Sequence, residues 1–145
     1  MKIGGRWYNE LNSTMDLEVN GKSIRGSYVS AVGDVKGPYD LVGVTDEAES
    51  PTLGWVVAWQ NDQKSVAAVT AWTGQAQLVK IDGQEKEQID TMWILIRSTA
   101  VQDDWESTMI GKDTFRRDPF TEDEVRRAMK VRGVRVVRPP APPNR

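Results

Sequence analysis

Apolar and polar residues alternate along much of the first 115 positions, and turn residues interrupt the alternation at short intervals. Side chains of a β-strand point alternately to its two faces, so this period predicts strands with one buried face. Asn20-Gly21 predicts a tight type I′ hairpin turn between the second and third strands. Between the turns we expect eight strands, at residues 6–11, 14–19, 23–29, 39–45, 53–60, 65–79, 84–97 and 107–115.

Eight antiparallel strands with short connections indicate an all-β fold and favour an up-and-down barrel, which closes on itself and leaves no sheet edge. A barrel of this size can hold one small ligand. A two-sheet sandwich has the same alternation without a cavity and is the alternative. Polar residues on the inward face favour the barrel, because a sandwich core tolerates few of them.

The same alternation places polar side chains on the face that carries the tryptophans. Trp7, Asn9 and Leu11 share one face of the first strand, as Thr70 and Trp72 do in a later one. Burying an unpaired amide, hydroxyl or carboxylate costs about 1–3 kcal/mol, so repeated burial of such groups suggests that a ligand pairs with them. The polar residues concerned are Asn9, Tyr28, Ser30, Thr70 and Asp113.

The composition restricts the chemistry of such a site. The chain has 145 residues, enough for one domain, with 39% hydrophobic and 28% charged residues. Histidine and cysteine are absent, which excludes Ser-His, Cys-His and His-metal catalysis and any disulfide. Only Asp113 is expected to face inward near the site, so no carboxylate pair is available for acid–base catalysis. We therefore expect no enzyme activity, no cofactor and no bound metal.

The charge pattern indicates neither a nucleic-acid nor a membrane partner for the whole chain. The net charge is −2, and no apolar run approaches the roughly 20 residues of a membrane span. Met1-Lys2 is followed by Ile-Gly-Gly-Arg and not by an apolar stretch, so we expect no signal peptide in this chain.

The composition changes after Phe115, which divides the chain into residues 1–115 and a C-terminal extension, residues 116–145. The extension carries nine Lys/Arg against four Asp/Glu, a net +5 that leaves −7 for the preceding residues. Thr121 and Glu124 form a capping-box pattern, flanked by Phe120 and Val125, and predict a helix at about 121–132 followed by a proline-rich extended end. We expect this helix to dock, either bracing the barrel or occluding a neighbour's pocket; disorder after residue 133 is the alternative.

Several segments follow one another in a distinctive order: Trp7-Tyr-Asn-Glu-Leu-Asn-Ser-Thr14, Gly26-Ser-Tyr-Val-Ser-Ala-Val-Gly33, Gly54-Trp-Val-Val-Ala-Trp59, Thr70-Ala-Trp72, Thr91-Met-Trp93-Ile-Leu95 and Trp105-Glu-Ser-Thr-Met-Ile-Gly-Lys-Asp-Thr-Phe115. In this order they resemble the avidin/streptavidin family, most nearly its bacterial, streptavidin-like branch. The resemblance covers about the first 115 residues. It implies an eight-stranded barrel that binds biotin tightly and non-covalently, in a protein that is secreted or periplasmic.

The resemblance also implies a role for each inward residue. Asn9, Ser13 and Tyr28 match the positions that donate to the ureido oxygen of biotin, while Asp113 and Ser30 match those that take its two N–H groups. Donors at one end and an acceptor at the other polarise the ureido group cooperatively. Trp7 and Trp55 we interpret as core residues at the closed end. The implied ligand-binding set is Asn9, Leu11, Ser13, Tyr28, Ser30, Val32, Gly33, Asp34, Val35, Trp59, Thr70, Trp72, Trp93, Leu95, Trp105 and Asp113.

Two features modify what the resemblance implies. Ala68 stands where streptavidin-like members commonly carry a hydroxyl for the carboxylate of biotin, and Val66 and Asp34 also depart from the pattern. The end of the site that holds the carboxylate is therefore expected to be weakened. Trp105 matches a tryptophan that closes the neighbouring subunit's pocket in tetrameric members, so we expect a homotetramer. The alternatives are a barrel carrier of another small apolar ligand, and an assembly protein whose site is partly occluded by a neighbour's tail.

Overall fold

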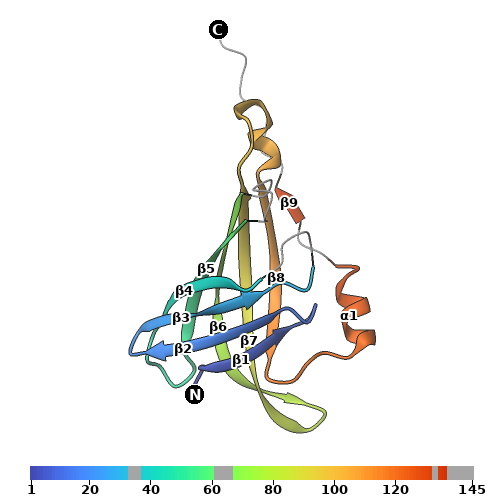
Figure 1. Ribbon diagram of the computed structural model, residues 1–145. Helices are drawn as coiled ribbons and strands as arrows, with labels where there is room; N and C mark the ends of the chain where they lie inside the picture. Colours follow the sequence, from blue (N-terminus) through green and yellow to red (C-terminus); the bar gives the residue numbers. More distant parts are fainter. Residues whose placement is uncertain (33–36, 61–66, 132–133, 137–145) are drawn as a thin grey trace.

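The computed structural model describes residues 1–32, 37–60, 67–131 and 134–136; the side chains of Trp105 and of 134–136 are not included in this description. Eight strands form one antiparallel barrel, in which each strand pairs with the next along the chain and β1 pairs with β8 (Figure 1). The predicted all-β barrel is confirmed. Its strands are β1 (Gly5–Asn9), β2 (Thr14–Asn20), β3 (Ser23–Val29), β4 (Tyr39–Thr45), β5 (Thr52–Trp59), β6 (Ala68–Ile81), β7 (Gln84–Arg97) and β8 (Thr108–Arg116).

The first strand is shorter than the alternation predicts. β1 ends at Asn9, whose side-chain oxygen accepts hydrogen bonds from the backbone N–H groups of Leu11 (3.0 Å) and Ser13 (2.9 Å). These bonds turn the chain, and Asn12 takes a left-handed φ of 60° within the turn. Leu11 therefore lies in a turn, half-buried, and the prediction that it continues the face of Trp7 and Asn9 is wrong.

The hairpin turns differ from the prediction in one detail. The β2–β3 loop consists of residues 21 and 22, and of these only Gly21 has a positive φ (59°). That is the pattern of a type II′ turn, so the predicted type I′ turn is wrong. The β6–β7 loop has positive φ at both Asp82 (50°) and Gly83 (77°), as a type I′ turn requires.

Two glycines allow close packing between neighbouring strands. A Cβ atom added at Gly26 would lie 1.9 Å from the backbone oxygen of Asp16, and one at Gly74 would lie 2.1 Å from that of Asp90. No side chain fits in these places, so glycine is required there for the wall to close at its present curvature.

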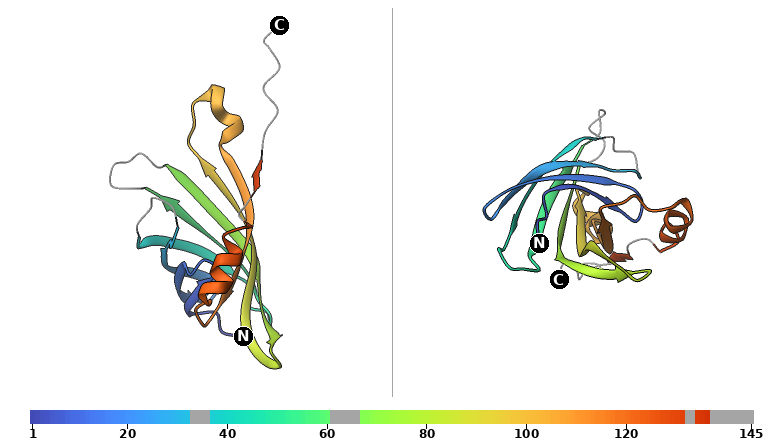
Figure 2. Two further views of the ribbon diagram at one scale, coloured as in Figure 1. Left: turned by 90° about the vertical axis from the view of Figure 1, so that its right-hand side faces the viewer. Right: turned by 90° about the horizontal axis from the view of Figure 1, so that it is seen from below.

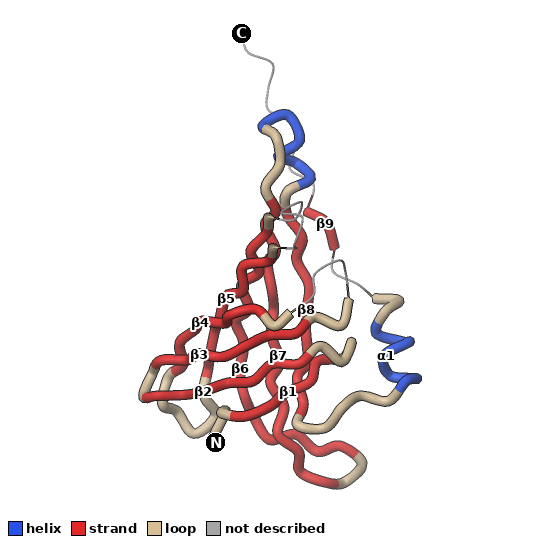
Figure 3. The backbone as a smooth tube through the Cα atoms, in the orientation of Figure 1, coloured by secondary structure: helices blue, strands red, loops and turns tan. Residues whose placement is uncertain are grey.

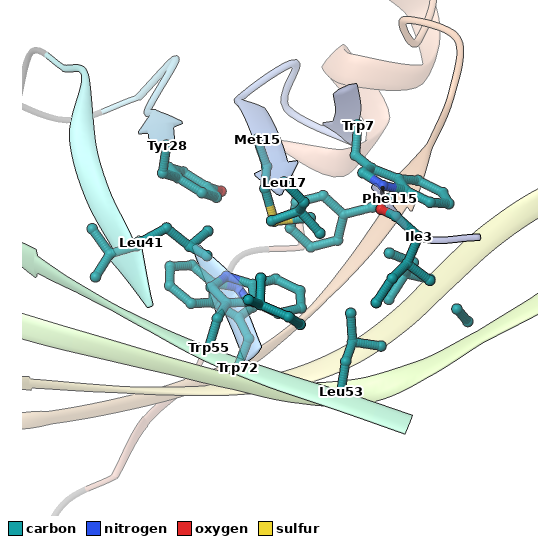
Figure 4. Close-up of a cluster of buried hydrophobic side chains, with 14 of the residues drawn as sticks. Ile3, Trp7, Met15, Leu17, Tyr28, Leu41, Leu53, Trp55, Trp72 and Phe115 are labelled. Atoms are coloured by element: carbon teal, nitrogen blue, oxygen red, sulfur yellow. Dashed lines mark hydrogen bonds between the residues drawn. The ribbon is translucent and has the colours of Figure 1, made fainter. Parts of the chain in front are cut away.

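Large apolar side chains fill the end of the barrel nearer the N-terminus, which we call the lower end (Figure 4). Trp7, Met15 and Phe115 are completely buried, and Trp55 stacks on Trp72 with ring centroids 5.7 Å apart. The indole N–H of Trp7 donates to the carbonyl of Ile3 (2.8 Å), and the guanidinium of Arg117 lies 3.7 Å from the Trp7 ring. The interpretation of Trp7 and Trp55 as core residues is confirmed.

Apolar side chains also lie on the outside of the barrel. Cross-strand pairing places Val69 opposite Ile96, and Ala71 between Val56 and Ile94. We call this surface the outer apolar face; its large members, each 42–51% exposed, are Val56, Val69, Met92, Ile94 and Ile96. A contiguous apolar surface of this kind on a water-facing sheet commonly marks an interaction site.

The C-terminal extension contains helix α1 (Glu122–Ala128), which lies outside the barrel wall (Figure 2). Both hydrogen bonds of the predicted capping box are present: Thr121 Oγ1 accepts from Glu124 N, and Glu124 accepts from Thr121 N. The helix is shorter than the predicted 121–132, because the backbone N–H groups of Lys130 and Val131 bond at i→i−3 spacing. No described helix is long and apolar enough to cross a bilayer.

The extension contacts the barrel at several places, among them Arg117 on the Trp7 ring and the ion pair of Glu124 in α1 with Arg116 of β8 (3.1 Å). Phe120 is buried, exchanges two hydrogen bonds with the side chain of Asn12 (2.9 and 3.1 Å) and lies under the Arg116 guanidinium. A short strand, β9 (Val134–Val136), pairs with Thr108–Ile110 of β8 (Figures 1 and 3). α1 itself has no buried residue, so Phe120, β9 and the Glu124–Arg116 ion pair, and not an apolar helix face, make the predicted docking contact. Residues 137–145, which include the prolines, lie outside the described residues.

Candidate ligand-binding site

Polar side chains converge inside the other half of the barrel, nearer the 3₁₀ helix η1 (Val101–Glu106), which we call the upper end. Asn9, Ser13, Tyr28 and Thr70 are 2–3% exposed and Asp113 is 9% exposed. They come from β1, the turn after it, β3, β6 and β8, so strands distant in sequence contribute to one interior. The structure places these five predicted residues on the buried side of the wall.

Asn9, Ser13 and Tyr28 form a connected group of hydrogen-bonding side chains. Because the oxygen of Asn9 is held by two backbone N–H groups, its Nδ2 group is directed to the Tyr28 hydroxyl (3.3 Å). Ser13 Oγ accepts from the backbone N–H of Ala31 (3.0 Å), and Ser13 N–H donates to the Asn9 side chain. Burial raises the pKa of Tyr28 well above its usual range, so the hydroxyl keeps its proton and can donate it.

Two indoles hold the carboxylate of Asp113. Trp72 Nε1 donates to Oδ2 (2.8 Å) and Trp93 Nε1 donates to Oδ1 (3.2 Å), so each oxygen has one tryptophan donor. Burial raises the pKa of Asp113 above its ordinary value, and these hydrogen bonds act in the opposite direction by stabilising the ionised form. Thr91 Oγ1 donates to the Asp113 carbonyl (2.9 Å), which fixes the backbone beneath the carboxylate.

A second carboxyl group lies beside Asp113, contrary to the prediction that no carboxylate pair exists. Glu10 Oε2 accepts from the backbone N–H of Thr114 (2.9 Å), and the Glu10 carboxyl is hydrogen-bonded to Asp113. Burial first, and then the charge of Asp113, raise the pKa of Glu10 to about 7. Alternation along a longer β1 places Glu10 outside the barrel. It reaches Asp113 because the chain turns after Asn9, and the only sequence signal for this was the turn-forming tendency of Asn9 and Asn12.

Aromatic rings surround these polar groups. Tyr28 stacks on Trp72 with centroids 5.2 Å apart, and Trp59 meets Trp72 edge-on at 6.3 Å. Trp59 Nε1 donates to Thr70 Oγ1 (2.8 Å), which leaves the Thr70 hydroxyl hydrogen free to donate elsewhere. Tyr39, which the sequence did not single out, packs edge-on against Trp59 at 5.2 Å.

The other predicted residues are half-buried or fall outside the described part of the chain. Both described hydrogen bonds of the Ser30 hydroxyl are with Val32, to its carbonyl (2.7 Å) and from its N–H (3.3 Å). Leu11, Val32, Trp93 and Leu95 are half-buried, as is Ala68 at the start of β6. The predictions for Gly33, Asp34, Val35 and Val66 fall outside the described residues, and so does the side chain of Trp105, whose backbone belongs to η1.

A groove of about 700 Å³ lies at the lower end of the molecule, lined by Met1–Gly4, Val19, Gly21, residues 45–49 and Pro51. Apart from Thr45, its polar side chains lie at exposed positions, so nothing there requires a ligand. Within the described part of the chain, no three His, Cys, Asp or Glu side chains gather as ligands of a metal would. The upper end is therefore the candidate site.

A model of the avidin family matches residues 1–118. The chain belongs to the avidin family. It is 29% identical over 129 residues to avidin-related protein 6 of Gallus gallus, an alignment that covers 83% of this chain and 81% of that protein. It is 36% identical over 84 residues to afifavidin of Afifella pfennigii, covering 55% of this chain and about half (51%) of the relative. The matched region of this avidin-family chain ends before α1 and β9, so the barrel is the shared part.

Proposed function

We propose that this protein binds biotin non-covalently in the upper end of the barrel, without catalysing a reaction. The proposal rests on two groups in the same interior. They are the buried donors Asn9, Ser13 and Tyr28, and the Asp113 carboxylate, which two indoles hold in place. A cyclic urea has the complementary pattern of one strong acceptor oxygen and two N–H donors. Each partner is oriented before the ligand arrives, which reduces the ordering entropy lost on binding.

A carrier of a purely apolar ligand is less consistent with this interior. Such a ligand would exclude water from Tyr28, Asn9 and Asp113 without replacing its hydrogen bonds, at a cost of about 1–3 kcal/mol for each group left unpaired. The ring stack of Tyr28, Trp72 and Trp59 supplies apolar walls for a small bicyclic ligand, and the polar groups select its head.

We further propose that the chain forms a homotetramer in which Trp105 of one subunit closes a neighbour's site. The outer apolar face supports self-association, since Val56, Val69, Met92, Ile94 and Ile96 are 42–51% exposed in one chain and continuous across β5, β6 and β7. A second copy presents the same surface, so a two-fold arrangement buries both at once.

Titration with biotin, followed by tryptophan fluorescence, tests the ligand. We expect saturable quenching at one biotin per chain, because three of the site tryptophans line the same interior. Dodecanoate serves as the matched apolar ligand, and its inability to displace biotin is expected. Quenching by dodecanoate together with no response to biotin would refute the proposal in favour of an apolar carrier.

Light scattering on the purified protein tests the assembly. The expected mass is four chains, and Ile94→Asp on the outer apolar face is expected to give smaller species. A monomeric wild-type protein at micromolar concentration would contradict the tetramer without affecting the ligand proposal.

A further inference from the structure

Glu10 is a half-buried ionisable group that has no role in the donor and acceptor pattern described above. It follows the last residue of β1, and its Oε2 takes the Thr114 N–H at 2.9 Å, just beyond the Asn9–Phe115 pair that ends the β1–β8 ladder. The Glu10 side chain therefore accepts the next hydrogen bond of that ladder in place of the β1 backbone, which has turned away. Its hydrogen bond to the Thr114 N–H of β8 holds Glu10 next to Asp113, the residue whose carboxylate is assigned to the ligand.

The hydrogen bonds around Asp113 define what Glu10 can do. An ionised carboxylate offers about four lone-pair sites. Trp72 and Trp93 each occupy one, and the carboxyl group of Glu10 interacts with that of Asp113. When Glu10 carries a proton, its O–H donates to Asp113 and occupies one of the two remaining sites. When Glu10 is ionised, that donor is lost and one site on Asp113 becomes available.

We propose that Glu10 is a positioning residue for ligand recognition, whose carboxyl proton competes with a ligand N–H for Asp113, so that binding releases this proton to solvent. The inference rests on the proposed function, because it requires a ligand that donates an N–H at this point. After proton loss, the carboxylates of Glu10 and Asp113 repel each other. A ligand N–H donor between them is attracted to both charges.

The charges around Glu10 determine the sign of the pH dependence. The titratable groups that act on it are Asp113 on β8 and Tyr28 on β3, and Tyr28 stays protonated because burial raises its pKa. Arg116, two residues along β8 from Thr114, is paired with Glu124 at 3.1 Å. With the pKa of Glu10 raised to about 7, the proton is present in acid and absent in base. Affinity for an N–H donor therefore rises with pH up to about 7 and is level above about 8.

The test uses biotinamide, because it retains the ureido group and lacks the carboxylate of biotin. Its dissociation constant for the full chain is expected to fall by about 15-fold in total between pH 5.5 and 7, most steeply at the acid end of this range. Calorimetry in two buffers of different ionisation enthalpy is expected to show release of up to one proton per site near pH 6. Glu10→Gln keeps an acceptor for Thr114 N–H and a permanent donor to Asp113, so it is expected to bind with a flat pH profile and no proton release.

Glu85→Gln is the matched control, because Glu85 is an exposed residue near the β6–β7 turn, and it is expected to behave as wild type. Wild-type binding that does not change with pH and releases no proton would overturn the inference and leave biotin binding intact. A Glu10→Gln variant that keeps the wild-type pH profile would also overturn it. Absence of biotinamide binding at every pH would refute the proposed function itself, and the inference with it.

Discussion

At the lower end of the barrel, Trp7 and Trp55 are at most 2% exposed and pack against Met15, Phe115 and the ring of Trp72. The indole N–H of Trp55 has no hydrogen-bond partner in the described structure, and that of Trp7 reaches only a local carbonyl. These two tryptophans stabilise the barrel through apolar area and close packing.

At the upper end, each of three tryptophans donates its indole N–H to a side-chain oxygen. Trp59 donates to Thr70, and Trp72 and Trp93 donate to Asp113. The ring faces remain apolar walls while the N–H groups orient the polar residues. The comparison shows that tryptophans on the same inward face of the wall have two roles. A tryptophan whose N–H has no side-chain partner packs the core, and a tryptophan whose N–H donates to a polar side chain orients the binding site.

The largest effect is expected from removing the acceptor at the upper end. Asp113→Ala leaves the Trp72 and Trp93 N–H groups without their partner and removes a charge-assisted bond to the ligand. We expect biotin affinity to fall by about 3 kcal/mol, more than a hundredfold. Isothermal calorimetry measures the loss. Affinity within about threefold of wild type would show that Asp113 does not contact the ligand.

A matched pair of substitutions separates the two roles of tryptophan. Trp72→Phe removes the donor to Asp113 and is expected to reduce biotin affinity by about 2 kcal/mol. Trp55→Phe removes no hydrogen bond and is expected to leave affinity nearly unchanged, while lowering the free energy of unfolding by about 1–2 kcal/mol through lost packing. Dissociation rates and urea unfolding measure the two effects. Equal losses of affinity in both variants would contradict the distinction between the two ends.

Titratable groups in the upper end predict how the stability of the ligand-free protein depends on pH. Folding raises the pKa of Glu10 from 4.5 to about 7, so the folded state holds more protons than the unfolded state between these values. The free energy of unfolding is therefore expected to fall as pH rises from about 4.5 to 7, by roughly 1.5 kcal/mol after allowance for the partial exposure of Glu10. Urea unfolding across this range measures it. Glu10→Gln should flatten the curve and Glu85→Gln should not; a wild-type curve that rises with pH would contradict the assignment.

The smallest effect concerns the rim of the upper end. Ala68 is half-buried at the start of β6, opposite Trp59. Adding a hydroxyl with Ala68→Ser is expected to slow biotin release by about five- to tenfold, through one more hydrogen bond to the ligand carboxylate. Stopped-flow displacement measures the rate, and biotinamide, which lacks this charge, is the control ligand. An equal effect on both ligands would mean that the new hydroxyl does not reach the carboxylate.

Features that depend on neighbours along the chain could be predicted from the amino-acid sequence. Alternation gave the eight strands and the inward face of Asn9, Thr70 and Asp113, because side-chain direction in a strand follows from position alone. The capping box of α1 was likewise readable, since Thr121 and Glu124 satisfy each other's backbone within one turn.

Features in which distant segments meet, or in which the backbone leaves its regular path, could be established only from the folded molecule. Strand alternation predicts the wrong side of the wall for Glu10, because β1 ends in a turn after Asn9. Glu10 comes close to Asp113 only when β1 pairs with β8. The pairing of β9 with β8 likewise joins segments that meet only in the folded barrel. Local propensity does not contain this information, because these contacts join residues that are far apart in the sequence.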